Sequence, residues 1–200
     1  MRCVRRVISS RSGEEGKNIT LTTYRLGTER TPYANVKADT SATRPIALDI
    51  NASYVTVKNI QASEARYAGF MLRKQQGHIK VLSPRARRCG FGIRMESSYS
   101  LIGHADIQQL VISKVGAGLL NEGAVGIVVQ SNGDLCTGNV INRAYVVDGW
   151  ALTDTGQDGN AVEFFGDVTD ALVTGGVFIR SKGGHEFGGY TSKADGQIAS

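Results

Sequence analysis

Charged side chains occupy one variable position of a short phrase that the chain repeats, and they are the residues best placed to do chemistry. The phrase is a small residue followed by apolar–any–apolar, and one copy is Gly92-Ile93-Arg94-Met95. The variable position holds Arg94 in this copy, Glu163 in a later one and Glu186 in a weaker last one. Alternate side chains of a strand point to the same face. These charges therefore share one face of the molecule if the copies stack as neighbouring strands.

Two chemistries fit the two glutamates. In adjacent strands Glu163 and Glu186 would lie about 5 Å apart at the backbone, and such a carboxyl pair could hydrolyse a glycosidic bond. Alternatively the pair, with Asp154 or Asp158, could hold Ca²⁺ through hard oxygen ligands. The cation would neutralise a uronate carboxylate, and a Lys or Arg base would then start β-elimination. A third interpretation is that both glutamates are solvated side chains on the outside of a strand.

The remaining candidates are basic, aromatic or amide side chains that could act on or hold an acidic sugar: Arg73, Lys74, Arg94, Gln130, Tyr145 and Trp150. Arg73 could instead form a cross-strand ion pair with Glu96. Trp150 is the single tryptophan, and it could stack on a sugar ring or pack its own segment against the protein. Tyr145 lies in the same long segment, and Gln130 follows the fourth strong copy of the phrase.

The repeated phrase also predicts the scaffold that positions these residues. Its strong copies are Ala47-Leu48-Asp49-Ile50, Gly69-Phe70-Met71-Leu72, Gly92-Ile93-Arg94-Met95, Gly126-Ile127-Val128-Val129 and Ala161-Val162-Glu163-Phe164. They recur at steps of about 22, 23, 34 and 35 residues, periods typical of a solenoid. Alternation within each copy indicates a strand. We expect an all-β, right-handed parallel β-helix of about six or seven coils, with one interior column: Leu48, Phe70, Ile93, Ile127 and Val162.

Weaker regularities predict the rest of each coil. A second strand is expected in each coil, with Val55, Ile79, Ile102, Leu135 and Leu172 at matching places that form a second column, and a polar turn position is expected at Asn59, Ser83, Asp106, Asn139 and Gly176. Asn59 and Asn139 could use their amides to bond the next coil. The longer steps predict loops at roughly 113–123 and 143–159, where function is expected. We interpret residues 1–200 as one domain, with an opening coil and loop at 1–43, coils at 44–190 and a polar tail or incomplete coil at 191–200.

Composition narrows the function classes. The net charge of +5 favours a polyanionic partner, but no recognition-helix pattern or zinc spacing points to nucleic acid. Three cysteines without a C-x-x-C pair argue against a disulfide framework or zinc site; Cys136 is expected to be a small buried residue. No apolar run is long enough for a membrane span, and Met1–Ser10 contains no signal peptide.

The opening segment carries a family resemblance. Ser12-Gly13-Glu14-Glu15-Gly16-Lys17-Asn18-Ile19-Thr20-Leu21-Thr22-Thr23-Tyr24 resembles the S-G-x-x-G-x-P-I-T-I-x-x-Y signature of pectate-lyase-type parallel β-helices, with Asn18 where Pro is usual. The resemblance implies a polysaccharide lyase or glycosidase, or a tailspike or adhesin, working outside the cell or in the periplasm. The N-T-D, Asp-Asp, R-I-K and R-x-P-x-x-R motifs of such enzymes are absent, so no family catalytic residue transfers.

Together these observations predict a carbohydrate-active protein that cleaves an acidic polysaccharide, as a lyase or a glycoside hydrolase, in a groove on one sheet face. The alternative is a non-catalytic glycan-binding or tailspike-like module. Ca²⁺ is the one cofactor implied, and the sequence leaves the oligomeric state open. Because Ser200 falls within an expected coil, we expect a fragment of a longer protein or a partner that covers this end.

Overall fold

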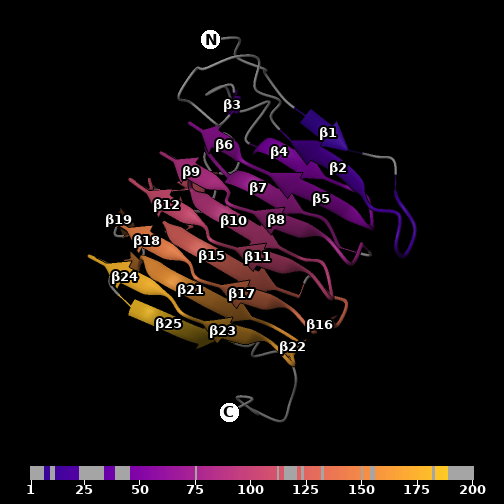
Figure 1. Cartoon of the computed structure of the whole chain (residues 1–200). Coiled ribbons are helices and arrows are strands. Elements are labelled where there is room, and N and C mark those ends of the chain that lie inside the picture. Colours follow the sequence, from indigo (N-terminus) through magenta and orange to yellow (C-terminus); the bar gives the residue numbers. More distant parts are fainter. Residues whose placement is uncertain are drawn as a thin grey trace.

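The computed structural model contains three parallel sheets that run side by side along the molecule, and successive strands enter them in rotation (Figure 1). The structure describes residues 7–9, 12–22, 34–38, 46–74, 76–111, 113–114, 121–122, 124–131, 133–149, 151–153, 156–181 and 183–188. Of these, residues 7–9, 113–114, 121–122, 151–153, 156–158 and 183–188 are described by their backbone alone. The described ranges contain no helix, and hence none that is long and apolar enough to cross a bilayer.

Sheet 1 has seven strands: β1 (Val7–Ser9), β4 (Ile46–Ile50), β7 (Ala68–Leu72), β10 (Phe91–Met95), β15 (Val125–Gln130), β21 (Asn160–Phe165) and β25 (Gly183–Gly188). Sheet 2 has six: β2 (Ile19–Thr22), β5 (Val55–Lys58), β8 (Lys80–Leu82), β11 (Leu101–Gly103), β17 (Val140–Asn142) and β23 (Leu172–Thr174). Sheet 3 has six: β3 (Ala34–Lys37), β6 (Ile60–Ser63), β9 (Arg85–Arg87), β12 (Asp106–Gln108), β18 (Tyr145–Val147) and β24 (Val177–Ile179).

The stacking confirms the predicted parallel β-helix. Within sheet 1 the apolar letters of the phrase lie in register, Leu48 beside Phe70, Phe70 beside Ile93, and so on through Ile127 to Val162. All five side chains of this column are fully buried. A coil cannot bury its own apolar side, so each depends on the coils above and below it.

Steric crowding explains why the first residue of the repeated phrase is small. A Cβ placed on Gly92 would lie 2.5 Å from the Gly126 carbonyl oxygen and 2.6 Å from a methyl carbon of Ile107 in sheet 3. A Cβ on Gly126 would likewise lie 2.4 Å from the Ala161 carbonyl oxygen. The small residue and the apolar residue that follows it both face the interior, which interrupts the strict alternation of the strand. Side chains of sheet 3, such as Ile107, occupy the space beside the small residue that a larger side chain would need.

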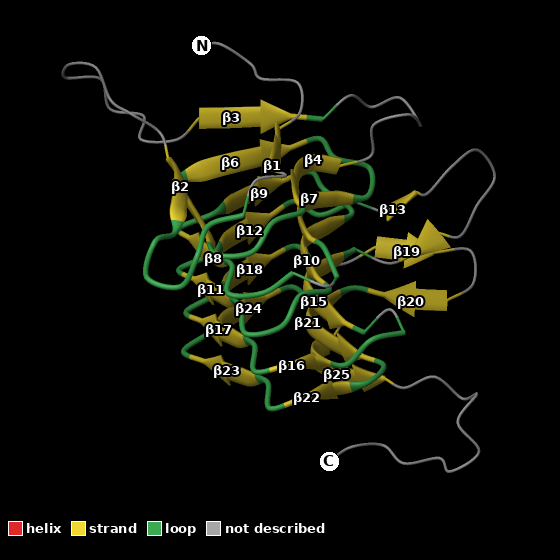
Figure 2. Ribbon diagram, turned by 90° about the vertical axis from the view of Figure 1, so that its right-hand side faces the viewer, coloured by secondary structure: helices red, strands yellow, loops and turns green. Residues whose placement is uncertain are grey.

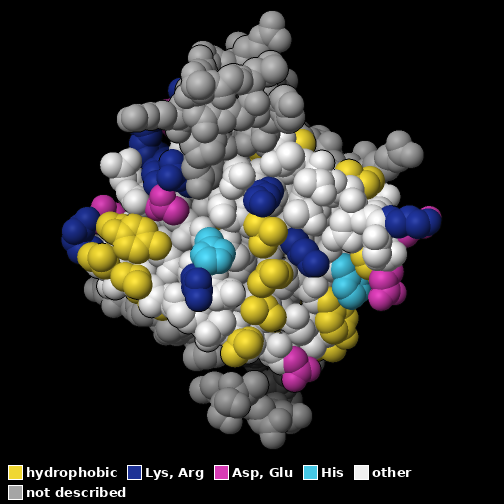
Figure 3. All heavy atoms as spheres, viewed as in Figure 1, with side chains coloured by type: hydrophobic (Ala, Val, Ile, Leu, Met, Phe, Trp, Pro, Cys, Tyr) yellow, Lys and Arg dark blue, Asp and Glu magenta, His cyan; other side chains and the backbone are white. Residues whose placement is uncertain are grey.

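The predicted second column is wrong in register. The column inside sheet 2 is formed by side chains of its central positions, Val57, Val81, Ile102, Ile141 and Val173. Leu135 and Leu172 are instead more than half exposed. Leu172 belongs to an apolar column on the outer surface of sheet 2, with Leu101 and Val140 beside it in register. Figure 3 shows apolar side chains running down the middle of this face.

Single left-handed residues turn the chain at three corners, which we name corner 1 (sheet 1 to sheet 2), corner 2 (sheet 2 to sheet 3) and corner 3 (sheet 3 to sheet 1). Corner 1 uses Tyr54, His78, Tyr99, Gly138 and Asp170; corner 2 uses Asn59, Ser83, His104, Arg143 and Gly175; corner 3 uses Glu64, Arg88, Gln109, Asp148 and Arg180. All have φ between 49° and 67°. The predicted polar turn column is therefore wrong, because Asn59 and Ser83 lie at corner 2, Asn139 lies next to corner 1, and Asp106 belongs to β12 rather than to a turn.

The corners differ in length between coils. In the five coils from β5 and β6 to β23 and β24, two residues separate equivalent register positions of sheets 2 and 3 at corner 2, as between Lys58 and Gln61 or between Thr174 and Val177. The first coil differs, because β2 ends at Thr22 and β3 begins only at Ala34. Corner 3 varies, and it carries two antiparallel hairpins, β13 (Ser113–Lys114) with β14 (Asn121–Glu122) and β19 (Ala151–Thr153) with β20 (Gly156–Asp158). These correspond to the predicted loops, although the second begins only after β18.

A buried polar cluster stabilises corner 1 beneath its surface. The Asn139 side chain accepts a hydrogen bond from the Ser100 N–H at 2.9 Å and donates one to the Ser97 carbonyl oxygen at 2.8 Å. The predicted amide bond from Asn139 to the neighbouring coil is thus confirmed. Cys136 lies in β16 (Cys136–Thr137), which pairs with β22 (Val168–Thr169), and it is buried as expected.

Candidate functional site on the outer face of sheet 1

The outer face of sheet 1 holds the variable letters of the phrase, as predicted. Asp49, Met71, Arg94, Val128 and Glu163 lie beside one another in successive strands. All of these side chains except Glu163 are buried.

A second apolar cluster explains that burial. It lies on the outer side of sheet 1, separate from the interior, and consists of Ile46, Ala68, Met71, Phe91, Val125 and Val128, with Tyr67 packed against it. Figure 2 shows the hairpin strands β13, β19 and β20 projecting beside this sheet, on one side of the molecule. The insertions at corner 3 therefore lie next to the face that carries the candidate residues.

Arg94 is held between a carboxylate and two aromatic rings. Its Nε donates a hydrogen bond to the Glu96 carboxylate at 2.9 Å, and both side chains are more than nine-tenths buried. The guanidinium carbon lies 5.0 Å from the ring centre of Tyr67 and 5.4 Å from that of Phe91. These two rings meet edge to face at 5.4 Å. The arginine is thereby fixed in one place, since a cation over an aromatic face is stabilised when it is shielded from water.

Arg73 forms a different ion pair from the one expected. Its Nε and Nη2 atoms donate to the two carboxylate oxygens of Asp49 at 2.7 and 2.8 Å. This hydrogen bond is the main reason that the pKa of Arg73 is raised, with smaller contributions from the charges of Asp49, Glu96 and Tyr67. The predicted Arg73–Glu96 ion pair is wrong, because Arg73 pairs with Asp49 and Glu96 pairs with Arg94.

Tyr67, beside Arg94, is the residue that sequence reasoning missed. It immediately precedes β7 and lies two residues before the repeated phrase, so the alternation did not place it on any face. The available signal was an aromatic residue close to the start of each of two consecutive copies, since Phe91 opens the next strand, β10.

Two further candidates lie near these ion pairs. Lys74 follows Arg73, is exposed, and lies 4.0 Å from the carboxylate of Asp134. Gln130 ends β15 and is half-buried, in register with Phe165 of β21. Both therefore lie at the end of sheet 1 that leads into corner 1.

The two glutamates are neighbours along the stack. Glu163 and Glu186 lie in register in β21 and β25, and Glu163 is half-buried. The side chain of Glu186 lies outside the described residues, as does that of Asp158, whose backbone belongs to β20. Trp150 and Asp154 lie outside them entirely. Within the described part of the chain, no three His, Cys, Asp or Glu side chains converge as a metal site would require.

Tyr145 does not join the site. It lies in β18 on the outer surface of sheet 3, in register with Asp106 and Val177, and it is more than one-third exposed. Sheets 1 and 3 face different directions, so this tyrosine cannot contact a ligand held by Arg73 and Arg94 on the face of sheet 1.

Comparison with known proteins supports the architecture. No family model matches the sequence, and no curated protein matches it. The structure resembles the crystal structure of an alginate lyase from Paenibacillus sp. str. FPU-7, with a TM-score of 0.62 and 18% sequence identity. The match covers 86% of this chain but only 56% of the lyase chain. The two proteins therefore share a fold, and this chain spans little more than half of the lyase.

Proposed function

We propose that this protein cleaves an acidic polysaccharide by β-elimination on the outer face of sheet 1. The observation that carries the proposal is the presence of two ion pairs on that face, Asp49 with Arg73 and Glu96 with Arg94, and of the Tyr67 ring beside Arg94. Charged side chains are seldom buried without a specific reason. The fold shared with an alginate lyase and the net charge of +5 support a polyanionic sugar substrate.

The chemistry needs a cation for the substrate carboxylate and a group that removes a proton. Guanidinium groups bind carboxylates through two parallel hydrogen bonds, so Arg73 or Arg94 would hold the uronate and make its C5 proton more acidic. The Tyr67 phenolate would take that proton. The electron pair of the C5–H bond would form a C4–C5 double bond as the C4–O bond breaks, and the departing oxygen would receive a proton.

In a second version of the proposed mechanism, Ca²⁺ assists the β-elimination. Carboxylates at positions 163 and 186, with Asp154 or Asp158 on the corner 3 insertion, are the hard oxygen ligands that this ion prefers. A cation there would neutralise the uronate carboxylate in place of an arginine. Export to the periplasm or the cell exterior, where such polymers occur, is proposed with it.

The deciding experiment measures unsaturated product by ultraviolet absorbance, and reducing ends in parallel, on alginate, pectate and chondroitin with and without Ca²⁺. We expect both signals on at least one polymer. Tyr67→Phe keeps the ring beside Arg94 and should lower kcat by about a hundredfold or more. Tyr54→Phe, at corner 1, is the matched control and should leave kcat unchanged. Wild-type activity that survives in Tyr67→Phe would overturn the role of Tyr67.

Two alternatives give different results in the same assay. Hydrolysis by Glu163 and Glu186, which lie in register, would produce reducing ends without unsaturated product. A glycan-binding module is favoured by one observation, namely that Arg94 and Glu96 are buried and paired with each other. It would bind a polymer and turn over none, and that outcome would overturn the proposed lyase activity.

A further inference from the structure

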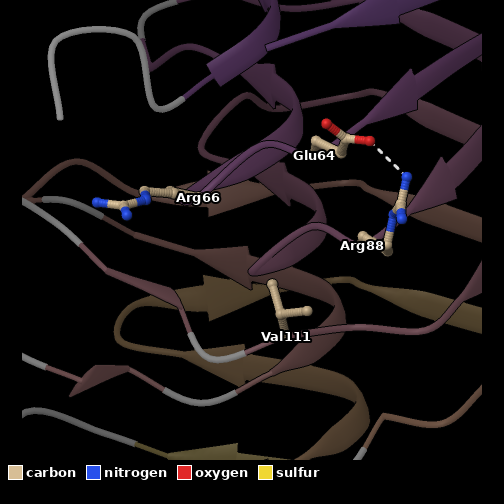
Figure 4. A pocket seen from close by; sticks show the side chains of 4 residues that line it. All are labelled: Glu64, Arg66, Arg88 and Val111. Atoms are coloured by element: carbon tan, nitrogen blue, oxygen red, sulfur yellow. Dashed lines mark hydrogen bonds and ion pairs between the residues drawn. The ribbon is translucent and has the colours of Figure 1, made fainter. Parts of the chain in front are cut away.

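A pocket at corner 3 lies outside the two ion pairs on sheet 1. It has a volume of ≈ 320 Å³ and is lined by Glu64, Arg66, Arg88 and Val111. In Figure 4 Arg66 extends away from the Glu64–Arg88 pair, with Val111 between the two sides. The pocket is an open depression, and its volume lies at the low end of the range of about 300–1,000 Å³ for ligand sites, which leaves room for one sugar unit and its carboxylate.

The backbone of corner 3 fixes these side chains in place. Glu64 and Arg88 are left-handed corner residues of consecutive coils, and the Glu64 N–H donates to the Arg87 carbonyl oxygen at 3.0 Å. The Val111 N–H donates to the Cys89 carbonyl oxygen at 3.0 Å, which holds an exposed apolar side chain against the pocket. The lining residues therefore come from three successive coils on a rigid ladder.

The charge of the pocket is unbalanced. Arg88 and Lys37 both form ion pairs with Glu64. Arg66 is exposed, and among the residues that the structure describes it has neither a hydrogen bond nor an ion pair. Two cations thus share the Glu64 carboxylate, and the guanidinium of Arg66 retains all of its donors for a ligand.

The pocket also adjoins the candidate site. Arg66 immediately precedes Tyr67, whose ring lies beside Arg94 on the face of sheet 1. A polymer that crosses this face and continues over corner 3 would therefore meet Arg66 next. An apolar side chain beside cations suits a uronate, whose ring presents C–H groups on one side and a carboxylate at its edge.

We propose that this pocket binds one uronate unit of an acidic polysaccharide outside the cleavage site, with Arg66 on the carboxylate and Val111 beneath the ring. The choice of a uronate over other carboxylates rests on the proposed function. Binding itself does not depend on cleavage, so the two can fail separately.

The test is calorimetric titration of trigalacturonate into the full chain carrying Tyr67→Phe, which keeps the sugar intact. Arg66→Ala should weaken binding by about five- to tenfold, as expected for loss of a charge-assisted hydrogen bond. Val111→Asp should weaken it at least as much, because it places a carboxylate beside that of the ligand. Lys80→Ala removes an exposed cation from sheet 2 and should change nothing. Thermal unfolding of each variant should match that of the parent.

Two comparisons identify the ligand chemistry. The methyl ester of the same trisaccharide should bind weakly and be insensitive to Arg66→Ala. Inorganic phosphate should not compete at concentrations that exceed those of the sugar. Equal binding by Arg66→Ala and Lys80→Ala variants, equal loss for the ester, or efficient competition by phosphate would each overturn the proposal. None of these results depends on whether the wild-type protein cleaves a polymer.

Discussion

Asp49 receives a two-pronged hydrogen bond from Arg73, with distances of 2.7 Å from Nε and 2.8 Å from Nη2. The two residues belong to consecutive coils, since Asp49 lies in β4 and Arg73 directly follows β7. The Asp49 carboxylate is almost fully buried, whereas Arg73 is about one-third exposed. The ion pair therefore links two coils on the outside of sheet 1. Its removal should cost more free energy at Asp49 than at Arg73, because the Asp49 carboxylate is the more buried group.

Arg73→Met should destabilise the protein by about 3 kcal/mol, because it removes the two-pronged hydrogen bond and the compensating charge from a buried carboxylate. Urea unfolding at neutral pH measures this directly. The double variant Asp49→Asn/Arg73→Met should recover a substantial part of the loss, giving a coupling energy in a double-mutant cycle. A loss below about 0.5 kcal/mol, typical of exposed ion pairs, would contradict the burial argument.

Gly92→Ala should destabilise the protein by about 1–3 kcal/mol through overpacking. The new methyl group would lie 2.5 Å from the Gly126 carbonyl oxygen, part of a backbone that cannot move without disturbing the next coil. Gly103→Ala is the matched comparison, because its methyl group meets only the end of the Leu82 side chain at 3.1 Å. Thermal unfolding should separate the two variants, and equal melting temperatures would show that sheet 1 can relax.

His104→Gly should stabilise the protein by about 0.5 kcal/mol. His104 is exposed at corner 2 with φ of 55°, and a side chain in this left-handed region costs roughly 1–2 kcal/mol that glycine avoids, partly offset by the greater flexibility of glycine when unfolded. His104→Val should destabilise, since β-branched residues fit this conformation worst. Denaturant midpoints decide both, and the reverse order of stability would refute the role given to the corner.

Burial raises the pKa of the Cys89 thiol from 9.0 to about 11. Above pH 9 the thiol of the unfolded chain loses its proton first, while that of the folded chain keeps it. The stabilisation is therefore complete below pH 9 and is lost as the pH rises towards 11, by about 2 kcal/mol for this group. Urea unfolding across this range should show a smaller decline in Cys89→Ala than in the parent. Identical declines would mean that water reaches the thiol.

The same burial makes both described cysteines unreactive. Desolvation also raises the pKa of Cys136 to about 11, and the thiolate is the form that reacts. In a Cys3→Ser background at pH 8, a disulfide reagent should label the folded protein slowly and the urea-unfolded protein at once. Rapid labelling of the folded state would contradict the packing around both thiols.

The interior of sheet 1 could be predicted because its strands are long enough to show alternation. Three of them, β7, β10 and β15, also contain a glycine at the position where a larger side chain would clash with the next coil. Gly69, Gly92 and Gly126 recur wherever the backbone of the next coil approaches closely, so the small letter fixed the register of each copy. Strands of sheets 2 and 3 have only three or four residues. In sheet 2 the outward Leu101 and Leu172 are apolar as well, so alternation alone could not assign their faces.

The candidate site was predicted in part. Alternation placed Asp49 and Arg94 on the outer face of sheet 1, and register placed Glu163 beside Glu186. The partners of Arg73 and Arg94 could not be deduced, since a pairing depends on which side chains exclude water from the face. The contribution of Tyr67 depends on a turn rather than on a strand, and turns vary in length from coil to coil.

That variation has a practical consequence for corners 2 and 3. A deletion of one residue at corner 2 would shift the strand that follows and turn its interior side chains, such as Ala62 and Ala86, towards water. Corner 3 already accommodates connections of very different length without disturbing the stack. New chain termini, exchanged loops or an inserted peptide tag would therefore be tolerated at corner 3, whereas corner 2 sets the spacing shared by the five coils from β5 and β6 to β23 and β24.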